Sequence, residues 1–300
     1  MANFAVIGVG GYIAPWHLDA IKECGHKLVT SYDSKDSVGI MDRYFPDCQF
    51  FTEFERFATF VDKAKGTKDQ VDWISICTPN YLHADHIRFA LRNGANAICE
   101  KPLVLHTKDI DDLVKVEKET GKKAYTVLQL RVHDAVKAMK EKVQRENKDL
   151  YNIELEYMTS RGQWYHASWK GDERKSGGLS TNIGVHFFDM LTWIFGSVKE
   201  IRMEKRGPSL EKGFVRLEKA KVNWLLTIDR KNLPAEAAMA GKTTYRSIKI
   251  DGEDFEFSEG FTELHKIVYK DILSGGGYGI SDARPAIEIV EKIREMESQK

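Results

Sequence analysis

Short apolar runs alternate with amphipathic stretches through the first 125 residues. The apolar runs are residues 4–8, 27–32, 71–77, 95–99 and 124–129. Continuous apolar runs of this length are typical of parallel strands that are buried on both faces. Strands that alternate with helices predict a parallel sheet with right-handed crossovers. We therefore expect an α/β fold with a Rossmann dinucleotide-binding domain over residues 1–125.

Local signals predict the ends of the intervening helices. Gly25 follows the periodic apolar residues Leu18 and Ile21 and is expected to end the first helix. Thr52 and Glu55 have the spacing of a capping box, which predicts a helix that runs to about residue 65. Further helices are expected over residues 80–93, 107–121 and 131–147.

After residue 150 the apolar positions recur with a period of two. This alternation runs through residues 151–157 and returns at residues 222–228. Asp251-Gly252 separates two more strand patterns and predicts a tight hairpin. We expect a second α/β domain over residues 126–300, with a large, mostly antiparallel, open sheet. Its closing helices are expected at residues 261–273 and 283–297.

Composition limits the classes of partner. The chain has 45 basic and 45 acidic residues, so its charge does not favour nucleic acid or an anionic membrane. The N-terminus lacks the features of a signal peptide, and no apolar run approaches the roughly 18 residues that a membrane span needs. The four cysteines form no CxxC pair and are expected to be reduced thiols. We expect a soluble, cytoplasmic protein.

The first apolar run leads into a glycine-rich loop, Gly8-Val9-Gly10-Gly11-Tyr12-Ile13. Such a loop between a strand and a helix brings backbone N–H groups close to a pyrophosphate at the positive end of the helix. Asp33 ends the second apolar run, where a carboxylate holds the adenosine ribose hydroxyls and repels a 2′-phosphate. Together the loop and the carboxylate favour NAD over NADP.

Lys101 follows the apolar run 95–99, within Glu100-Lys101-Pro102. Functional groups of open parallel sheets lie beyond the carboxyl ends of the strands. A partly buried lysine shifts its pKa readily and is suited to proton transfer. An exposed lysine at a strand end, in contrast, needs no function. Pro102 follows, and proline makes the cis peptide isomer accessible.

Polar residues also follow the run 71–77. Thr78, Asn80 and His83 are expected on the nicotinamide side of the same crevice. His83 and His86 lie three residues apart on a helix, which is one arrangement of a metal pair. No third ligand has suitable spacing, so we expect no metal.

Aromatic and basic residues are interleaved with glycines between residues 161 and 189. Arg161, Tyr165, Lys170 and Arg174 belong to this segment and suit an anionic ligand that contains rings. His186 lies in an otherwise apolar helix pattern. A lone histidine there is usually a core residue, unless another group needs it.

In order along the chain, four features resemble the Gfo/Idh/MocA oxidoreductase family. They are the glycine loop, the Thr-Pro-Asn-x-x-His stretch at 78–83, Glu100-Lys101-Pro102, and Gly177-Gly178 with Gly184-Val185-His186. Within the family, CTPNYLH, SRGQWY and TNIGVHFFDML look like the NAD-dependent UDP-N-acetylglucosaminuronate 3-dehydrogenases of O-antigen synthesis. Two positions depart from the broad family pattern: Ile13 replaces the third glycine, and Asn182 replaces a carboxylate.

The resemblance implies oxidation of the C3 hydroxyl of UDP-N-acetyl-D-glucosaminuronate to the 3-keto sugar, with NAD as the cofactor. Our hypothesis is that Lys101 and His186 hold that hydroxyl between them. We favour His186 as the base and Lys101 as the group that stabilises the alkoxide, and the reverse assignment stays open. Asn182 can orient a hydroxyl but cannot take a proton.

The resemblance also implies two sets of binding residues. The expected NAD contacts are Gly8, Gly10, Gly11, Tyr12, Ile13, Asp33, Thr78, Asn80, His83, Glu100, Lys101, Gln129 and Trp169. The expected sugar-nucleotide contacts are Lys101, Arg161, Tyr165, Lys170, Arg174, Asn182 and His186, with the basic residues at the carboxylate or diphosphate. We expect a homodimer or homotetramer. Another sugar or inositol dehydrogenase of the family, or an NAD-binding regulator without turnover, stays open.

Overall fold

The computed structural model describes residues 1–146, 148–257 and 263–296. The chain forms two compact units. The first unit comprises residues 1–104, 108–129 and 262–283, and the second comprises residues 105–107, 130–261 and 284–300. The expected helix ends at residues 147, 261 and 297 lie outside the described residues. The boundary between residues 125 and 126 stays a prediction about independently folding domains.

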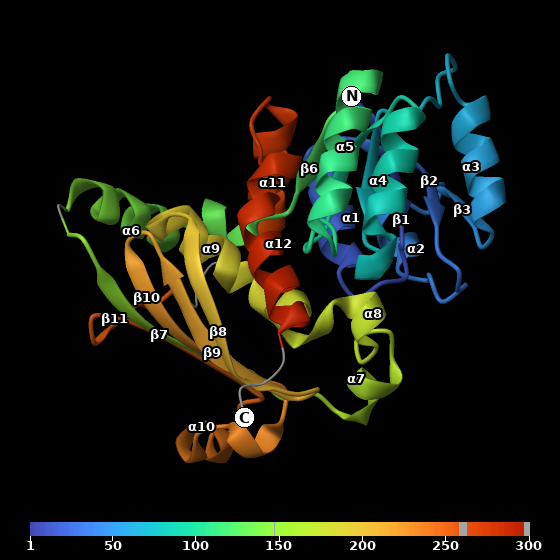
Figure 1. The fold of residues 1–300 in the computed structure, drawn as a ribbon. Helices are drawn as coiled ribbons and strands as arrows, with labels where there is room; N and C mark the ends of the chain where they lie inside the picture. Colours follow the sequence, from blue (N-terminus) through green and yellow to red (C-terminus); the bar gives the residue numbers. More distant parts are fainter. Residues whose placement is uncertain (147, 258–262, 297–300) are drawn as a thin grey trace. The chain divides into compact units, whose positions relative to one another are not determined.

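A six-stranded parallel sheet forms the centre of the first unit, in the order β3-β2-β1-β4-β5-β6 (Figure 1). Its strands are β1 (Asn3–Ile7), β2 (Lys27–Tyr32), β3 (Gln49–Phe51), β4 (Trp73–Ile76), β5 (Asn96–Cys99) and β6 (Ala124–Thr126). Each of the five apolar runs contains one of these strands, so the predicted parallel sheet is confirmed. The strand order reverses between β1 and β4, and ligands of such sheets bind beside that point.

The helices of the first unit connect and cover these strands. They are α1 (Ala14–Glu23), α2 (Met41–Tyr44), α3 (Phe54–Lys63), α4 (His83–Arg92), α5 (Thr107–Thr120) and α11 (Leu264–Leu273). Gly25 follows α1 with a φ of +73°, as predicted. The helix α11 comes from the far end of the sequence and packs along α1. This placement differs from the expected domain boundary, which assigns the helix at residues 261–273 to the second domain.

Three predicted helix starts are wrong. The N-cap of α3 is Glu53 and has no side-chain hydrogen bond, so Thr52 is one residue out of register for a capping box with Glu55. Asn80 opens a single 3-10 turn, and α4 starts at His83. A 3-10 turn also occupies residues 129–132, which delays α6 (Asp134–Arg145) by three residues.

The second unit is built on a mixed six-stranded sheet in the order β12-β11-β7-β10-β9-β8. Its strands are β7 (Tyr151–Thr159), β8 (Val198–Arg206), β9 (Leu210–Leu217), β10 (Ala220–Thr227), β11 (Thr244–Ile250) and β12 (Glu253–Asp254). Only β7 and β10 pair in parallel among these strands, so the predicted, mostly antiparallel sheet is confirmed. The pairing of Ile250 with Glu253 across Asp251-Gly252 confirms the hairpin.

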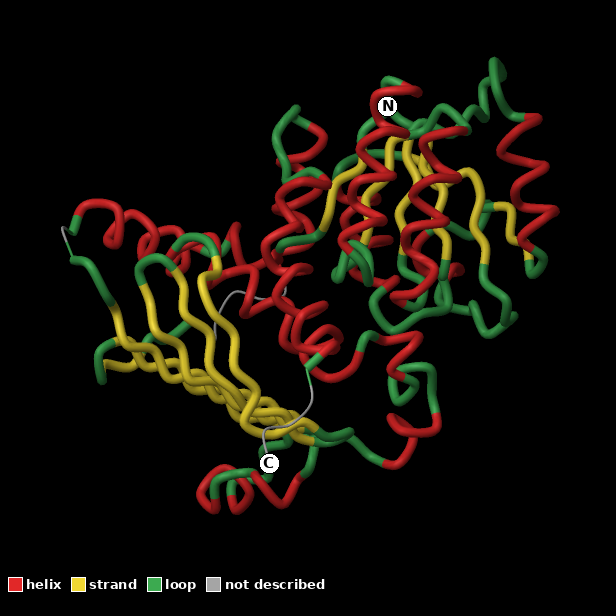
Figure 2. The backbone as a smooth tube through the Cα atoms, viewed as in Figure 1, coloured by secondary structure: helices red, strands yellow, loops and turns green. Residues whose placement is uncertain are grey.

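Helices α6 and α9 (Val185–Phe195) cover one face of this sheet (Figure 2). The remaining helices are α7 (Gln163–Ala167), α8 (Glu173–Ser176), α10 (Ala235–Met239) and α12 (Ile280–Glu295). Phe188 of α9 packs edge-on against Trp224 of β10. No helix among the described residues is long and apolar enough to cross a membrane.

Candidate active site

Three glycines shape the loop after β1. Gly8 has a φ of +86°, and a Cβ at this position would lie 2.8 Å from the carbonyl carbon of Cys77. A Cβ on Gly11 would lie 3.1 Å from the carbonyl oxygen of Gly8. The loop therefore passes directly against the end of β4. Ile13, the N-cap of α1, makes no side-chain capping bond, and a helix start of this kind suits a pyrophosphate.

Asp33 lies directly after β2 and is bonded to the glycine loop. Its Oδ2 accepts a hydrogen bond from the N–H of Gly10 at 2.9 Å, and its Oδ1 accepts one from the N–H of Lys35 at 3.0 Å. This geometry fixes a half-buried carboxylate beside the loop, where it fits ribose hydroxyls and opposes a 2′-phosphate. Tyr12, on the same loop, is 81% exposed and contacts the ring of Trp16.

His83 connects the loop after β4 to the loop after β5. Its Nε2 lies 2.8 Å from the carbonyl oxygen of Thr78, and its Nδ1 lies 2.7 Å from that of Pro102. Burial lowers the pKa of His83, although the two carbonyls oppose this shift. Thr78 also bonds His86 through its hydroxyl, at 3.0 Å. A neutral imidazole has one N–H, so His83 donates to one of these two carbonyl oxygens at a time. Asn80 is also buried at this end of β4.

Lys101 lies half-buried at the carboxyl end of β5. Its backbone N–H donates to Oε2 of Glu100 at 3.1 Å, and the Lys101–Pro102 peptide bond is cis. His83 lies at the carbonyl of the next residue, Pro102, so the loop has one partner at the N–H of Lys101 and another one residue beyond Lys101.

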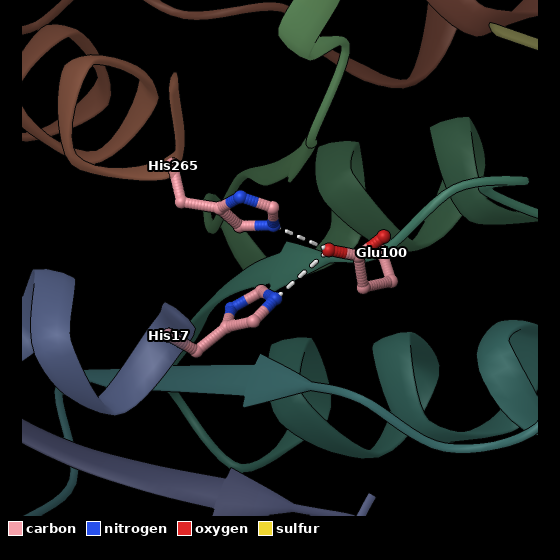
Figure 3. Close-up of side chains that lie close together, drawn as sticks. All are labelled: His17, Glu100 and His265. Atoms are coloured by element: carbon pink, nitrogen blue, oxygen red, sulfur yellow. Dashed lines mark hydrogen bonds and ion pairs between the residues drawn. The ribbon is translucent and has the colours of Figure 1, made fainter. Parts of the chain in front are cut away.

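Glu100 is buried and accepts two further hydrogen bonds on its other oxygen (Figure 3). Its Oε1 lies 3.0 Å from Nε2 of His17, on α1, and 2.8 Å from Nε2 of His265, on α11. Burial alone would raise the pKa of Glu100, but the hydrogen bonds from the two histidines outweigh burial and hold it well below its ordinary value. Burial lowers the pKa of His17. An ionised Glu100 therefore faces a neutral His17.

The network extends from His17 into the core. Nδ1 of His17 lies 2.7 Å from the hydroxyl of Tyr269, which lies 2.6 Å from Oγ of Ser75. Since Nε2 of neutral His17 carries the proton for Glu100, Nδ1 accepts from Tyr269, and the Tyr269 oxygen accepts from Ser75. Burial raises the pKa of Tyr269 well above its usual range, so this phenol keeps its proton.

In the part of the chain that the structure describes, His17, Glu100 and His265 also form a group with the composition of a metal site. Their ligand atoms lie within 4.8 Å of one another. A tetrahedral zinc ion with nitrogen and oxygen ligands at about 2.1 Å holds those atoms about 3.4 Å apart. The separations of 3.0 and 2.8 Å are shorter and match N–H···O hydrogen bonds. The geometry therefore fits a hydrogen-bonded cluster better than a metal site.

In the second unit, His186 is the second residue of α9 and is half-buried. A π-helical turn, Ser180–Gly184, directly precedes α9. Gly177 has a φ of +80°, and a Cβ there would lie 2.6 Å from the side chain of Thr181. The chain thus turns tightly into the π-helical turn, where Nδ2 of Asn182 donates to the hydroxyl of Tyr165 at 2.9 Å.

Two cations lie near this tyrosine. The ammonium of Lys170 lies 5.4 Å from the ring centre of Trp164 and 5.7 Å from that of Trp169. Burial lowers the pKa of Lys170, and the charge of Arg161 lowers it further. Burial raises the pKa of Tyr165, while the bond to Asn182 and the charge of Arg161 oppose that shift. The structure therefore brings Arg161, Tyr165, Lys170 and Asn182 together, and two neighbouring cations suit an anionic ligand.

A pocket of about 240 Å³ opens beside these residues. It is lined by Tyr165, Lys170, Glu173, Ser176, Arg206 and Glu211, among others. Sequence reasoning missed Arg206, which pairs with Glu173, and Glu211, which accepts hydrogen bonds from the backbone and hydroxyl of Ser180. Both lie in ordinary strand patterns, where no local signal distinguishes them.

Arg174 does not join this cluster. Its guanidinium pairs with Asp172 at 3.2 Å, and its side chain is 90% exposed. Gln129 is half-buried and opens the 3-10 turn at the end of the first unit. Lys101 belongs to the first unit and His186 to the second.

Two family models match the chain. The model "Oxidoreductase family, NAD-binding Rossmann fold" matches residues 2–128, and "Oxidoreductase family, C-terminal alpha/beta domain" matches residues 140–254. This chain belongs to the Gfo/Idh/MocA oxidoreductase family. Membership confirms the resemblance, and NAD as the cofactor that the glycine loop and Asp33 predict.

Two solved structures are similar to this family member over their whole length. The WlbA (WbpB) dehydrogenase of Thermus thermophilus in complex with NAD and UDP-GlcNAcA is 47% identical, with 100% of this chain and 97% of that chain covered and a TM-score of 0.96. The same enzyme in complex with NAD and alpha-ketoglutarate is 48% identical, with the same coverage and a TM-score of 0.97.

The curated relatives are more distant in sequence. The 2,7-anhydro-N-acetylneuraminate hydratase of Mediterraneibacter gnavus is 24% identical over 66% of this chain and 50% of its own length. The chain thus spans about half the length of the first curated relatives it matches. Because a hydratase is among these relatives, the reaction has to be argued from side chains rather than from similarity alone.

Proposed function

We propose that this chain oxidises the C3 hydroxyl of UDP-N-acetyl-D-glucosaminuronate with NAD, in the synthesis of a bacterial surface polysaccharide. One observation carries the proposal: 47% identity over 100% of the chain to a dehydrogenase structure that contains NAD and UDP-GlcNAcA. The neighbouring cations Arg161 and Lys170 support it, because this substrate carries a carboxylate and a diphosphate.

The chemistry assigns one role to each member of the catalytic pair. NAD, when bound, supplies the acceptor for the hydride that leaves C3. His186 removes the proton of the C3 hydroxyl, and the ammonium of Lys101 donates a hydrogen bond to the same oxygen and stabilises its developing negative charge. In the reverse assignment Lys101 is the base and His186 is the donor.

Binding of the sugar nucleotide uses the cluster in the second unit. Arg161 and Lys170 hold the carboxylate or the diphosphate. Tyr165, bonded to Asn182, presents its ring and hydroxyl beside them. Asn182 is an amide and takes no proton, so it orients the substrate or the neighbouring tyrosine while proton transfer stays with Lys101 and His186.

The test incubates the purified protein with NAD and UDP-N-acetylglucosaminuronate and follows NADH absorbance. Trapping the product with borodeuteride and locating the deuterium by mass spectrometry identifies the oxidised carbon, which we expect to be C3. UDP-N-acetylglucosamine lacks the carboxylate and should react poorly. Oxidation of inositol or a free sugar instead would favour another dehydrogenase of the family. Bound NADH that no sugar changes would favour a regulator.

We also propose that a 2-oxo acid reoxidises the NADH. The Thermus thermophilus enzyme, at 48% identity, was solved with NAD and alpha-ketoglutarate. In that half-reaction NADH and a proton reduce the ketone of 2-oxoglutarate to 2-hydroxyglutarate. Added 2-oxoglutarate should therefore permit repeated turnover with catalytic amounts of NAD. Absence of 2-hydroxyglutarate after many turnovers would contradict recycling. The homodimer or homotetramer stays a prediction, which analytical ultracentrifugation tests.

A further inference from the structure

The carboxylate of Glu100 accepts three hydrogen bonds, although no step of the proposed reaction uses it. Its Oε1 accepts from His17 and His265, and its Oε2 accepts from the backbone N–H of Lys101 (Figure 3). The donors come from α1, α11 and the end of β5, which are far apart in the sequence. One buried side chain thus joins three elements directly beneath Lys101.

The two histidines decide the charge of this side chain. A carboxylate that is 6% exposed would become neutral without strong donors. The hydrogen bonds of His17 and His265 hold the pKa of Glu100 well below its usual range despite burial. An ionised carboxylate accepts a stronger hydrogen bond from the N–H of Lys101 than a neutral acid does.

We infer that His17 and His265 are positioning residues for Lys101, because they hold the ionised Glu100 that fixes the Lys101 backbone at the end of β5. The inference rests on the proposed role of Lys101. It adds a positioning role for two histidines whose rings act on Lys101 only through Glu100.

Two further contacts make this arrangement rigid. His17 is bonded through Tyr269 to Ser75 on β4, so its ring cannot rotate without breaking that chain. On the other side of Lys101, His83 bonds the carbonyl of Pro102 at 2.7 Å. The peptide group before Lys101 and the one after Pro102 both have a hydrogen-bond partner, so the backbone that carries the Lys101 side chain is held one peptide before and two peptides after its Cα.

The test compares His265→Phe, which removes the donor, with His265→Gln, whose amide can donate near the position of Nε2. The first measurement is hydrogen exchange of residues 100–103 by mass spectrometry. Pro102 has no N–H, so this segment reports few amides. We expect Lys101 in His265→Phe to exchange about tenfold faster or more. The second measurement is turnover: kcat should fall about tenfold while KM for the sugar nucleotide changes by less than about threefold.

His265→Gln should restore exchange and kcat to within about threefold of the unchanged protein. His26→Phe is the matched control: His26 also lies in the first unit, accepts from the N–H of Ala2 at 3.1 Å and packs on Phe4. His26→Phe should leave the exchange of the Lys101 amide and kcat unchanged. If His265→Phe does not fold, the variants His17→Gln and Glu100→Gln are compared with each other instead. We then expect faster exchange of the Lys101 amide in Glu100→Gln.

Three outcomes overturn the inference. One is wild-type exchange and kcat in a folded His265→Phe protein. Another is equal loss in His265→Phe and His265→Gln. The third is one equivalent of zinc in the purified protein that both variants lose, since the cluster would then be a metal site. Failure to oxidise UDP-N-acetylglucosaminuronate would overturn the proposed function instead, and the exchange experiment would still decide the position of Lys101.

Discussion

The two units hold their candidate functional groups in different ways. In the first unit these groups lie at the carboxyl ends of β1, β2, β4 and β5 and are joined by buried hydrogen bonds. In the second unit they lie on loops, on short helices and at the start of α9, and the ammonium of Lys170 lies near two aromatic rings. The first arrangement fixes atoms through a buried hydrogen-bond network, whereas the second places a cation beside aromatic rings.

This difference corresponds to two physical requirements. Transfer of a hydride and a proton depends on sub-ångström positions, so a closed network around Lys101 is favourable. Recognition of a charged group depends on net charge and desolvation, and the half-buried Lys170 and exposed Arg161 meet that requirement without a rigid frame. Variants in each unit can test whether the first unit positions the reacting groups and the second recognises the charged ligand.

The largest effect is expected at the catalytic pair. Lys101→Met keeps the apolar stem and removes the charge, and His186→Gln removes the titrating ring. Each should lower kcat by about 100-fold or more, because each removes an interaction that strengthens in the transition state. NADH fluorescence should show that His186→Gln keeps its affinity for the cofactor, whereas Lys101 is itself an expected NAD contact. Lys123→Met, which breaks a surface pair with Glu117, is the control. Near-normal turnover in both variants would contradict the assignment.

Cofactor choice tests the first unit further. Asp33→Ser should raise KM for NAD about tenfold, because the charge-assisted hydrogen bonds to the ribose hydroxyls are lost. Use of NADP should rise, since the repulsion of its 2′-phosphate is removed. Steady-state kinetics with both cofactors measures the change. Asp36→Ser, at an exposed carboxylate three residues on, should leave the preference unchanged. An unaltered NAD preference in Asp33→Ser would assign the discrimination to another residue.

A smaller effect is expected at the cation cluster of the second unit. Lys170→Met should raise KM for the sugar nucleotide about fivefold while kcat holds, because a half-exposed cation contributes about 1 kcal/mol to binding. Arg174→Leu should change KM by less than about twofold, since Arg174 faces Asp172 and solvent. Lys199→Met, at a pair with Glu218 on β8, is the neutral control. A larger loss at Arg174 than at Lys170 would reverse the roles of these residues.

The smallest effect concerns pH and stability. Burial lowers the pKa of His86 to about 4. As the pH falls, the unfolded chain therefore protonates His86 at a higher pH than the folded chain does. The contribution of neutral His86 to the free energy of unfolding is complete above the ordinary pKa of about 6.5 and is lost between about pH 6.5 and about pH 4. From about pH 7 to pH 6 the free energy of unfolding should fall by about 0.7 kcal/mol. Thermal melting should show a shallower pH dependence in His86→Asn. An identical slope would exclude His86 as its source.

The periodic elements could be predicted from the sequence, since their signals are local. Each apolar run of the first unit contains a strand, Gly25 follows α1 in the left-handed region, and Asp251-Gly252 makes the hairpin. Asp33 could be predicted because strand order places it beside the glycine loop. The capping box at Thr52 failed, because a one-residue shift of the helix start removes its geometry.

The supports of the site could not be predicted. His265 lies 165 residues from Glu100, and nothing in its helix pattern distinguishes it from a core histidine. The bond between Tyr165 and Asn182 depends on a glycine turn and a π-helical turn that have no periodic signature. Arg174 fits the basic pattern as well as Lys170 does, and only the position of Asp172 separates them.

The π-helical turn Ser180–Gly184 has a consequence for how this segment can change by insertion or deletion. A π-turn amounts to one extra residue within an α-helix. Because the wider turn takes up that residue, removing one residue between 180 and 184 would leave a regular α-helix, and the residues of α9 would keep the faces that they now present. A deletion within α9 itself would instead rotate the residues beyond it by about 100°, and with them part of the apolar face that packs on the sheet. A change in length is therefore accommodated better in this turn than in the helix that follows it.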